Sequence, residues 1–155
     1  MWTVLLSGGI DSAAALASAV AEDRSTTAIH VAFGQPAAKQ ELSAATQIAN
    51  YYRVNLQVLE LAGITTFSDG EIPGRNAFIV HAGLLFARGR PTTLVLAIHG
   101  GTPYRDCTPE FLDLMRCSVA FHANGVVTLA APFLQWSKAD VYRFAKTMRV
   151  PFELT

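Results

Sequence analysis

The stretch Ser7-Gly8-Gly9-Ile10-Asp11-Ser12 decides how this chain folds, because it joins an apolar run to an alanine-rich helical run. The apolar run Trp2–Leu6 has the pattern of a buried strand, and Ile10–Ala21 has that of a helix. Two glycines permit backbone conformations that a side chain would forbid, and they let a ligand approach the main chain closely. The unpaired N–H groups and the positive dipole end of the helix then predict a site for phosphate oxygens.

The polar residues of this loop extend the predicted phosphate site. Ser7 and Ser12 add hydroxyl donors, and Asp11 in the first helical turn suits the dipole and is placed to hold Mg²⁺ beside the phosphates. The loop lacks the Gly-Lys-Ser/Thr ending of the Walker pattern, and its glycines are not spaced as in the dinucleotide fingerprint. The alternative is a glycine turn that only joins a strand to a helix.

The composition favours one globular domain covering residues 1–155. Hydrophobic residues make up 51% of the 155 and the mean hydropathy is +0.29, enough for a core and for a sheet covered on both faces. The net charge is zero and no basic stripe is present, which argues against a nucleic-acid partner. Without a membrane-length apolar run or a signal-peptide pattern, we expect no membrane partner and a cytoplasmic location. Cys107 and Cys117 are expected to be reduced thiols.

Short apolar runs alternate with helical runs along the chain, which predicts an α/β fold. We expect a doubly wound, mostly parallel five-stranded sheet with helices on both faces. The expected strands are Trp2–Leu6, Thr27–Phe33, Val54–Leu59, Thr93–Ile98 and Val126–Leu129. The expected helices are Ile10–Ala21, Ala37–Tyr52, Asn76–Arg88, Pro109–Ala123 and Lys138–Met148, with loops at Gly63–Pro73 and Gly100–Thr108. Ligands of such sheets bind beyond the carboxyl ends of the strands, so the loops there are the candidates for function.

Two of these loops carry residues suited to a nucleotide or a carboxylate. After the second strand, Gly34 would let main-chain groups approach an adenine and Phe33 would pack on its ring; the alternative is an ordinary strand-ending glycine. The turn Pro73-Gly74 places Arg75 and Asn76 at the start of a helix. The guanidinium of Arg75 offers two parallel donors to a phosphate or carboxylate. Alternatively, Asn76 is only an N-cap and Arg75 a solvated helix end.

Several motifs, in order along the chain, resemble those of the 7-cyano-7-deazaguanine synthase (QueC-like) family of PP-loop ATP pyrophosphatases. The hexapeptide at residues 7–12 is similar to the PP-loop, and the segment P-G-R-N at 73–76 to the family's V-P-G-R-N. Residues 104–111 look like its Y-P-D-C-R-P-E-F segment. Gly34-Gln35 with Glu41 resembles its Y-G-Q…E-L stretch, and Leu134 with Ser137-Lys138-Ala139 its L-T-K-A-E stretch. The likeness runs from Val4 to Thr155 and so covers essentially the whole chain.

The resemblance implies an AMP-forming, ATP-dependent C–N ligase of queuosine biosynthesis that forms a homodimer. The family activates the carboxylate of 7-carboxy-7-deazaguanine with ATP; ammonia displaces AMP to give an amide, and a second ATP leads to the nitrile. ATP and Mg²⁺ are the implied cofactors, and the deazapurine or another carboxylate, with ammonia, the implied partners. The candidate cofactor-binding residues are Ser7, Gly8, Gly9, Ile10, Asp11, Ser12, Phe33, Gly34 and Gln35, with Asp11 on magnesium. The candidate catalytic residues are Asp11, Arg75, Asp106 and Lys138, and the candidate substrate-binding residues Arg75, Asn76, His99, Tyr104 and Asp106.

Adenylylation develops charge on phosphate, so it needs donors and cations more than a nucleophilic side chain. Lys138 would neutralise phosphate as a point charge, although a lone lysine there is otherwise usually solvated. Arg75 would clamp substrate or phosphate, and Asp106 would orient the base or ammonia.

Three features depart from the family's pattern. The family carries a zinc-binding cysteine cluster near its C-terminus, where this chain stops at Thr155; Cys107 matches the Asp-Cys motif, and two cysteines cannot make a four-sulfur site. We therefore expect a short form without zinc. The segment at residues 99–103 is shorter than the family's loop, and Arg105 and Thr108 stand where the family has Pro and Arg. His99 would act in proton transfer or contact substrate, or be a satisfied loop histidine.

Other functions remain open at this point. One is a non-catalytic ATP-binding subunit, or a QueC-like modification or defence protein with a different acceptor. Another is a PP-loop enzyme that transfers sulfur to tRNA. Such enzymes commonly use paired or cluster-binding cysteines and a basic surface, and the sequence shows neither. The helix at Phe78–Phe86 carries Ile79, Val80, Leu84 and Leu85, more apolar residues than one core-facing stripe requires, so it is either fully buried or part of a homodimer face.

Overall fold

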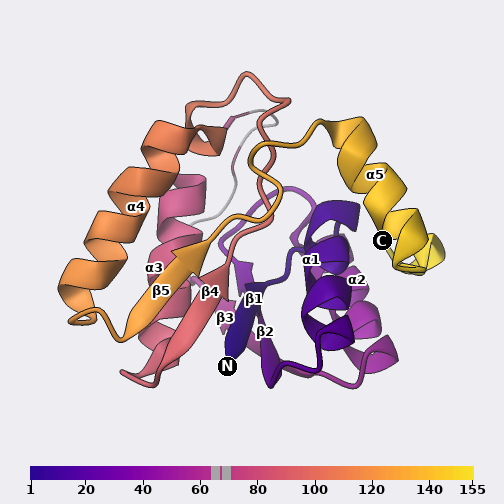
Figure 1. Cartoon of the computed structure of the whole chain (residues 1–155), viewed down its shortest axis with the longest axis horizontal. Helices are drawn as coiled ribbons and strands as arrows, with labels where there is room; N and C mark the ends of the chain where they lie inside the picture. Colours follow the sequence, from indigo (N-terminus) through magenta and orange to yellow (C-terminus); the bar gives the residue numbers. More distant parts are fainter. Residues whose placement is uncertain (64–66, 68–70) are drawn as a thin grey trace.

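The protein folds as a parallel sheet with helices packed on both faces (Figure 1). The computed structural model describes residues 1–63, 67 and 71–155. Its five strands are ordered β3-β2-β1-β4-β5, and every pairing is parallel. The predicted α/β class, strand number and doubly wound arrangement are thereby confirmed. Within the predicted loop Gly63–Pro73, residues 64–66 and 68–70 lie outside the described residues.

Each expected strand and helix is present, with small differences at its ends. The strands are β1 (Trp2–Leu5), β2 (Thr26–Ala32), β3 (Asn55–Glu60), β4 (Thr92–Val95) and β5 (Val127–Ala130). The helices are α1 (Ile10–Ala21), α2 (Ala38–Tyr51), α3 (Arg75–Ala87), α4 (Pro109–His122) and α5 (Lys138–Thr147), with short 3₁₀ turns η1 (Arg105–Cys107) and η2 (Phe152–Leu154). The largest difference is at β4, which ends at Val95 although the apolar run continues to Ile98. Leu96 and Ile98 are buried although they lie beyond the end of the strand. Their apolar side chains therefore reflect burial in the core and not pairing in the sheet.

Alternate residues of the central strand β1 enter two separate cores, as the twofold period of a strand requires. Val4, and Leu6 directly after the strand, pack in a cluster with residues of α1, α2 and α5. Leu5 faces the other way, into a cluster with residues of α3 and α4. Figure 1 shows these two groups of helices on opposite faces of the sheet. Burial on both faces explains why the strands read as continuous apolar runs.

The strand order reverses at β1, and this determines where a ligand can enter. From β1 the chain passes through α1, β2 and α2 to β3 at one edge, and then crosses to β4 on the other side of β1. The connections that follow β1 and β4 therefore leave toward opposite faces of the sheet, which opens a crevice at the carboxyl ends of these strands. The loop Ser7–Ser12 lies at this switch point.

The apolar helix α3 is only partly buried. Val80 is fully buried, whereas Leu85 is 77% exposed, so the expectation that this helix is fully buried is wrong. The other reading, a homodimer face, stays a prediction. Across the described residues, no helix combines the length and the apolar character needed to cross a membrane.

Candidate functional site

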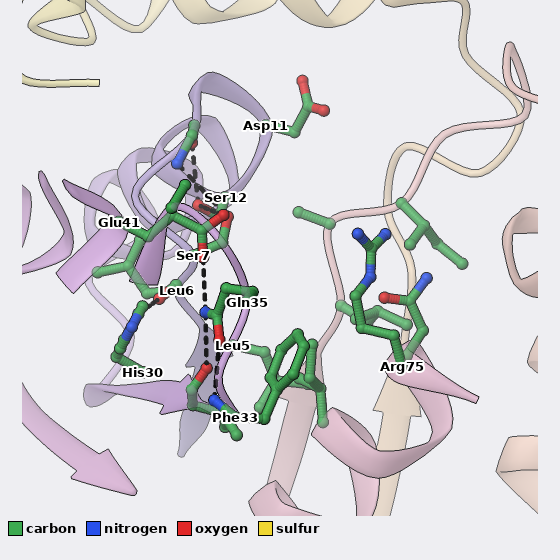
Figure 2. Close-up of a pocket in the computed structure, with 18 of the residues that line it drawn as sticks. Leu5, Leu6, Ser7, Asp11, Ser12, His30, Phe33, Gln35, Glu41 and Arg75 are labelled. Carbon is green, nitrogen blue, oxygen red and sulfur yellow. Dashed lines mark hydrogen bonds between the residues drawn. The ribbon is translucent and has the colours of Figure 1, made fainter. Parts of the chain in front are cut away.

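A cavity of about 440 Å³ opens at the carboxyl ends of the strands, at the switch point (Figure 2). One side is formed by the loop Ser7–Ser12, the end of β2 and the first turn of α2; Arg75 and Asn76 of α3 and the segment after β4 form the opposite side. Of the predicted site residues, those that line it are Ser7, Gly9, Ile10, Asp11, Ser12, Phe33, Gln35, Arg75, Asn76 and Lys138. Gly8, Gly34, His99, Tyr104 and Asp106 lie outside this lining.

The loop Ser7–Ser12 is held in shape by its own hydroxyl groups. The Oγ atoms of Ser7 and Ser12 are 3.2 Å apart, and the Ser12 hydroxyl donates to the Gly9 carbonyl at 2.9 Å. The Gly9 N–H donates to Ser7 Oγ at 3.4 Å. Among the described residues no side chain caps α1, so the start of this helix is available to an anion from the cavity.

Gly8 has a packing role. Its φ of +92° is unfavourable for any residue with a side chain, and a Cβ atom there would lie 2.7 Å from the Glu41 carbonyl oxygen. The first turn of α2 therefore packs directly on the loop.

Asp11 is the centre of a charged cluster at the rim of the cavity. Lys138, the first residue of α5, places its Nζ 2.6 and 2.8 Å from the two carboxylate oxygens of Asp11. His99 Nε2 is 3.8 Å from Asp11 Oδ2. Because the Gly101 N–H donates to His99 Nδ1 at 3.2 Å, the neutral ring carries its proton on Nε2, facing Asp11. The structure thus brings together three predicted residues that are distant in the sequence.

The residues around Asp11 fit magnesium only in combination with phosphate. Within the described ranges, no group of three or more His, Cys, Asp or Glu side chains is placed to hold a metal ion. Magnesium needs only one or two carboxylates when substrate phosphates and water complete its shell, and Asp11 offers one. The absence of zinc stays a prediction.

Gln35 fixes the end of β2 and orients a carboxylate that we did not predict as a site residue. The Phe33 N–H donates to Gln35 Oε1 at 2.8 Å, and Gln35 Nε2 donates to Glu41 Oε2 at 2.8 Å. Glu41 lines the cavity in the first turn of α2. The family-like pairing of Gln35 with Glu41 was the available sequence signal, but by itself it says nothing about which way the carboxylate faces.

His30 is a second residue that the sequence analysis missed. It is 1% exposed, lines the cavity, and places Nδ1 2.9 Å from the carbonyl oxygen of Leu6, the residue before the loop. Within the described part of the chain, its Nε2 has no hydrogen-bond partner. A histidine inside an otherwise apolar strand was the signal that could have identified it.

The opposite side of the cavity depends on hydrogen bonds between α3 and η1. Asn76 Nδ2 donates to the Asp106 carbonyl at 3.2 Å, and the Asn76 N–H donates to Asp106 Oδ2 at 3.4 Å. Asn76 is 4% exposed and lies inside α3, whose N-cap is Gly74, so the interpretation of Asn76 as only an N-cap is wrong. Arg75 lines the main cavity and also a cleft of about 10 Å³ beside Glu71, Tyr104 and Asp106. Tyr104 and Asp106 thus adjoin Arg75 in this small cleft and not in the main cavity.

The two cysteines are free and differ in exposure. Cys107 is buried next to Asn76, whereas Cys117 on α4 is exposed. Burial raises the pKa of the Cys107 thiol above its ordinary value, and the neighbouring Asp106 carboxylate acts in the same direction. The buried thiol is therefore a packing group and a poor nucleophile at neutral pH.

The sequence matches the family described as "Queuosine biosynthesis protein QueC" over residues 2–72 and 66–155. The 7-cyano-7-deazaguanine synthase of Microcystis aeruginosa is 31% identical over 178 residues, which cover 96% of this chain and 77% of that protein. The 7-cyano-7-deazaguanine synthase of Methanospirillum hungatei is 25% identical over 179 residues, which cover 97% of this chain and 81% of that protein.

Two solved structures share the fold. An NMN synthetase from Francisella tularensis superposes with a TM-score of 0.60 at 18% identity over 99% of this chain, which spans 63% of that protein's length. A predicted subunit of tRNA methyltransferase from Methanocaldococcus jannaschii gives 0.58 at 15% identity, over 93% of this chain and 73% of that one. At these identities the likeness concerns the fold alone.

Proposed function

This chain belongs to the QueC family of queuosine biosynthesis proteins, and we propose that it uses ATP to adenylylate a carboxylate and then forms an amide or nitrile with ammonia. The acceptor in this proposal is 7-carboxy-7-deazaguanine or a related deazapurine. One observation carries it: the loop Ser7–Ser12, the Asp11–Lys138 pair and Arg75 all face a single cavity at the switch point.

The loop side of the cavity would hold the phosphates. The hydroxyl of Ser7 and the first N–H groups of α1 donate to the β- and γ-phosphates, which leave together as pyrophosphate. Ser12 joins these donors when its hydroxyl turns from the Gly9 carbonyl to a phosphate oxygen. Lys138 brings an ammonium group 57% exposed at the rim, where it can turn from Asp11 to a phosphate oxygen. Magnesium, when bound at Asp11, neutralises phosphate charge.

The side formed by α3 would hold the acceptor. Arg75 places a guanidinium at the cavity, and such a group binds a carboxylate through two parallel hydrogen bonds. A carboxylate oxygen attacks the α-phosphorus, and the bond to pyrophosphate breaks. Ammonia then adds to the acyl carbon, the bond to AMP breaks, and loss of a proton gives the amide. The amide oxygen then attacks the α-phosphorus of a second ATP and pyrophosphate leaves. The nitrogen loses two protons as the carbon–oxygen bond to AMP breaks, which gives the nitrile.

Further features belong to the same proposal: one domain, a homodimer, a cytoplasmic location, no zinc, and no nucleic-acid or membrane partner. Asp106 supports the acceptor side through its contacts with α3.

The reaction is tested by following α-labelled ATP with Mg²⁺, with and without 7-carboxy-7-deazaguanine and ammonia. AMP is expected only when the acid is present. Lys138→Met is expected to slow AMP release at least about a hundredfold, because the ammonium group that would bind phosphate is lost. Lys146→Met, at the other end of α5, is the matched control and is expected to retain the rate. Release of ADP and phosphate would contradict the proposal.

A further inference from the structure

Glu41 is a carboxylate beside the phosphate loop for which the reaction described above has no use. It lies in the first turn of α2 and lines the cavity. Its carbonyl oxygen is the atom that a Cβ on Gly8 would meet at 2.7 Å, so its turn is in direct contact with the loop. Glu41 therefore borders the same cavity as the loop that would hold the phosphates.

The orientation of the carboxylate is fixed by a buried amide. Gln35 is 8% exposed, and its Oε1 accepts from the Phe33 N–H at 2.8 Å. Its Nε2 donates to Glu41 Oε2 at 2.8 Å and to the Val31 carbonyl at 3.4 Å. The opposite amide orientation would place Oε1 against two oxygen atoms, so this one is determined. Glu41 is thus held in place before a ligand arrives.

The chemistry of this group selects which part of a nucleotide it can meet. An ionised carboxylate only accepts hydrogen bonds, and it repels phosphate. Its ligand must therefore present hydroxyl or N–H donors. Contacts link the loop to the turn that carries Glu41, Glu41 to Gln35, and Gln35 to Phe33 of the aromatic and apolar wall. Figure 2 shows Gln35 between Ser7 and Phe33. This order corresponds to phosphates, sugar and base along ATP.

We propose that Glu41 binds the ribose of ATP, accepting hydrogen bonds from its vicinal 2′- and 3′-hydroxyl groups. The inference rests on the proposed use of ATP and adds the residue that distinguishes a ribonucleotide from its deoxy forms. Gln35 is the positioning residue that aims the carboxylate. A vicinal diol suits a carboxylate because both hydroxyls donate to it.

Calorimetry with ATP and 2′,3′-dideoxy-ATP, without acceptor, tests this pairing in the wild type and in Glu41→Ala. The wild type is expected to bind ATP at least about tenfold more tightly than the dideoxy nucleotide, the effect of losing hydrogen bonds to a charged group. Glu41→Ala is expected to weaken ATP binding by the same factor and to leave dideoxy-ATP binding unchanged. Glu110→Ala, an exposed acidic residue in the first turn of α4, is the matched control.

Three results would overturn the inference. Equal weakening of both nucleotides by Glu41→Ala would mean that the residue only packs the loop. A loss seen with Mg²⁺ but abolished by EDTA would make Glu41 a metal ligand. Unchanged binding of ATP to the variant would remove any role for the carboxylate. A wild type that binds neither nucleotide would instead refute the proposed function, and with it the premise of this inference.

Discussion

The two sides of the cavity are built in different ways. The phosphate-loop wall, Ser7–Ser12, is one run of six residues between β1 and α1, shaped by its own hydroxyls and by glycine. The Arg75 wall consists of Arg75 and Asn76 at the start of α3 with the segment after β4, and it is held from outside the cavity by Asp106 and Cys107, about 30 residues after Asn76. A contiguous wall depends on local backbone geometry, whereas an assembled wall depends on side-chain hydrogen bonds between distant segments.

The largest effect is expected from a methyl group on the phosphate-loop wall. Gly8→Ala should lower the free energy of unfolding by about 3 kcal/mol, because it combines a positive φ with a contact of 2.7 Å to main-chain oxygen. Gly125→Ala is the matched control: its φ of +75° is also positive, but nothing lies within 4 Å of the new Cβ, so only about 1 kcal/mol is expected. Urea denaturation measures both. Equal losses would show that α2 does not pack on the loop as described.

A smaller effect is expected from the Arg75 wall. Asn76→Ala removes the amide that donates to the Asp106 carbonyl, and it should lower the free energy of unfolding by about 1–2 kcal/mol. The same denaturation experiment on Asn50→Ala, an exposed residue of α2, provides the reference and should show little change. If Asn76→Ala is as stable as the wild type, the hydrogen bonds between α3 and η1 do not hold this wall.

The smallest effect on stability is expected from the ion pair between Asp11 and Lys138. Lys138→Ala breaks the ion pair with Asp11, but because the lysine side chain is 57% exposed, the change in unfolding free energy should stay below about 1 kcal/mol. The affinity of the Lys138→Ala variant for ATP, measured by calorimetry, should fall even though the fold is retained. A large loss of stability with unchanged ATP binding would make the ion pair structural and not functional.

The contrast between the walls also explains what the sequence could predict. Alternating apolar and helical runs, set by burial on both sheet faces, were enough for the parallel α/β fold. The phosphate-loop wall was predictable because its chemistry and its turn lie in consecutive residues. Boundaries were less predictable at β4, where Leu96 and Ile98 remain buried after the ladder has ended.

The contacts that connect distant segments could not be predicted from the sequence pattern. The sequence analysis predicted Asn76 and Asp106 as separate site residues, but the hydrogen bonds between them form only when η1 packs on α3. The same holds for Glu41, whose carboxylate is oriented by a hydrogen bond from Gln35. It also holds for His30 in β2, whose ring is hydrogen-bonded to the carbonyl oxygen of Leu6, just after the neighbouring strand β1. Each of these roles is a property of tertiary packing, which a periodic pattern does not encode.

The most direct test of the account is a crystal structure of the protein with Mg²⁺ and α,β-methylene-ATP, which cannot be cleaved to AMP. The account predicts the β- and γ-phosphates over Ser7–Ser12 at the start of α1, with Lys138 turned from Asp11 to a phosphate oxygen and the α-phosphate facing Arg75 across the cavity. A nucleotide bound elsewhere on the sheet, or phosphates seated away from this loop with the Asp11–Lys138 pair intact, would contradict it.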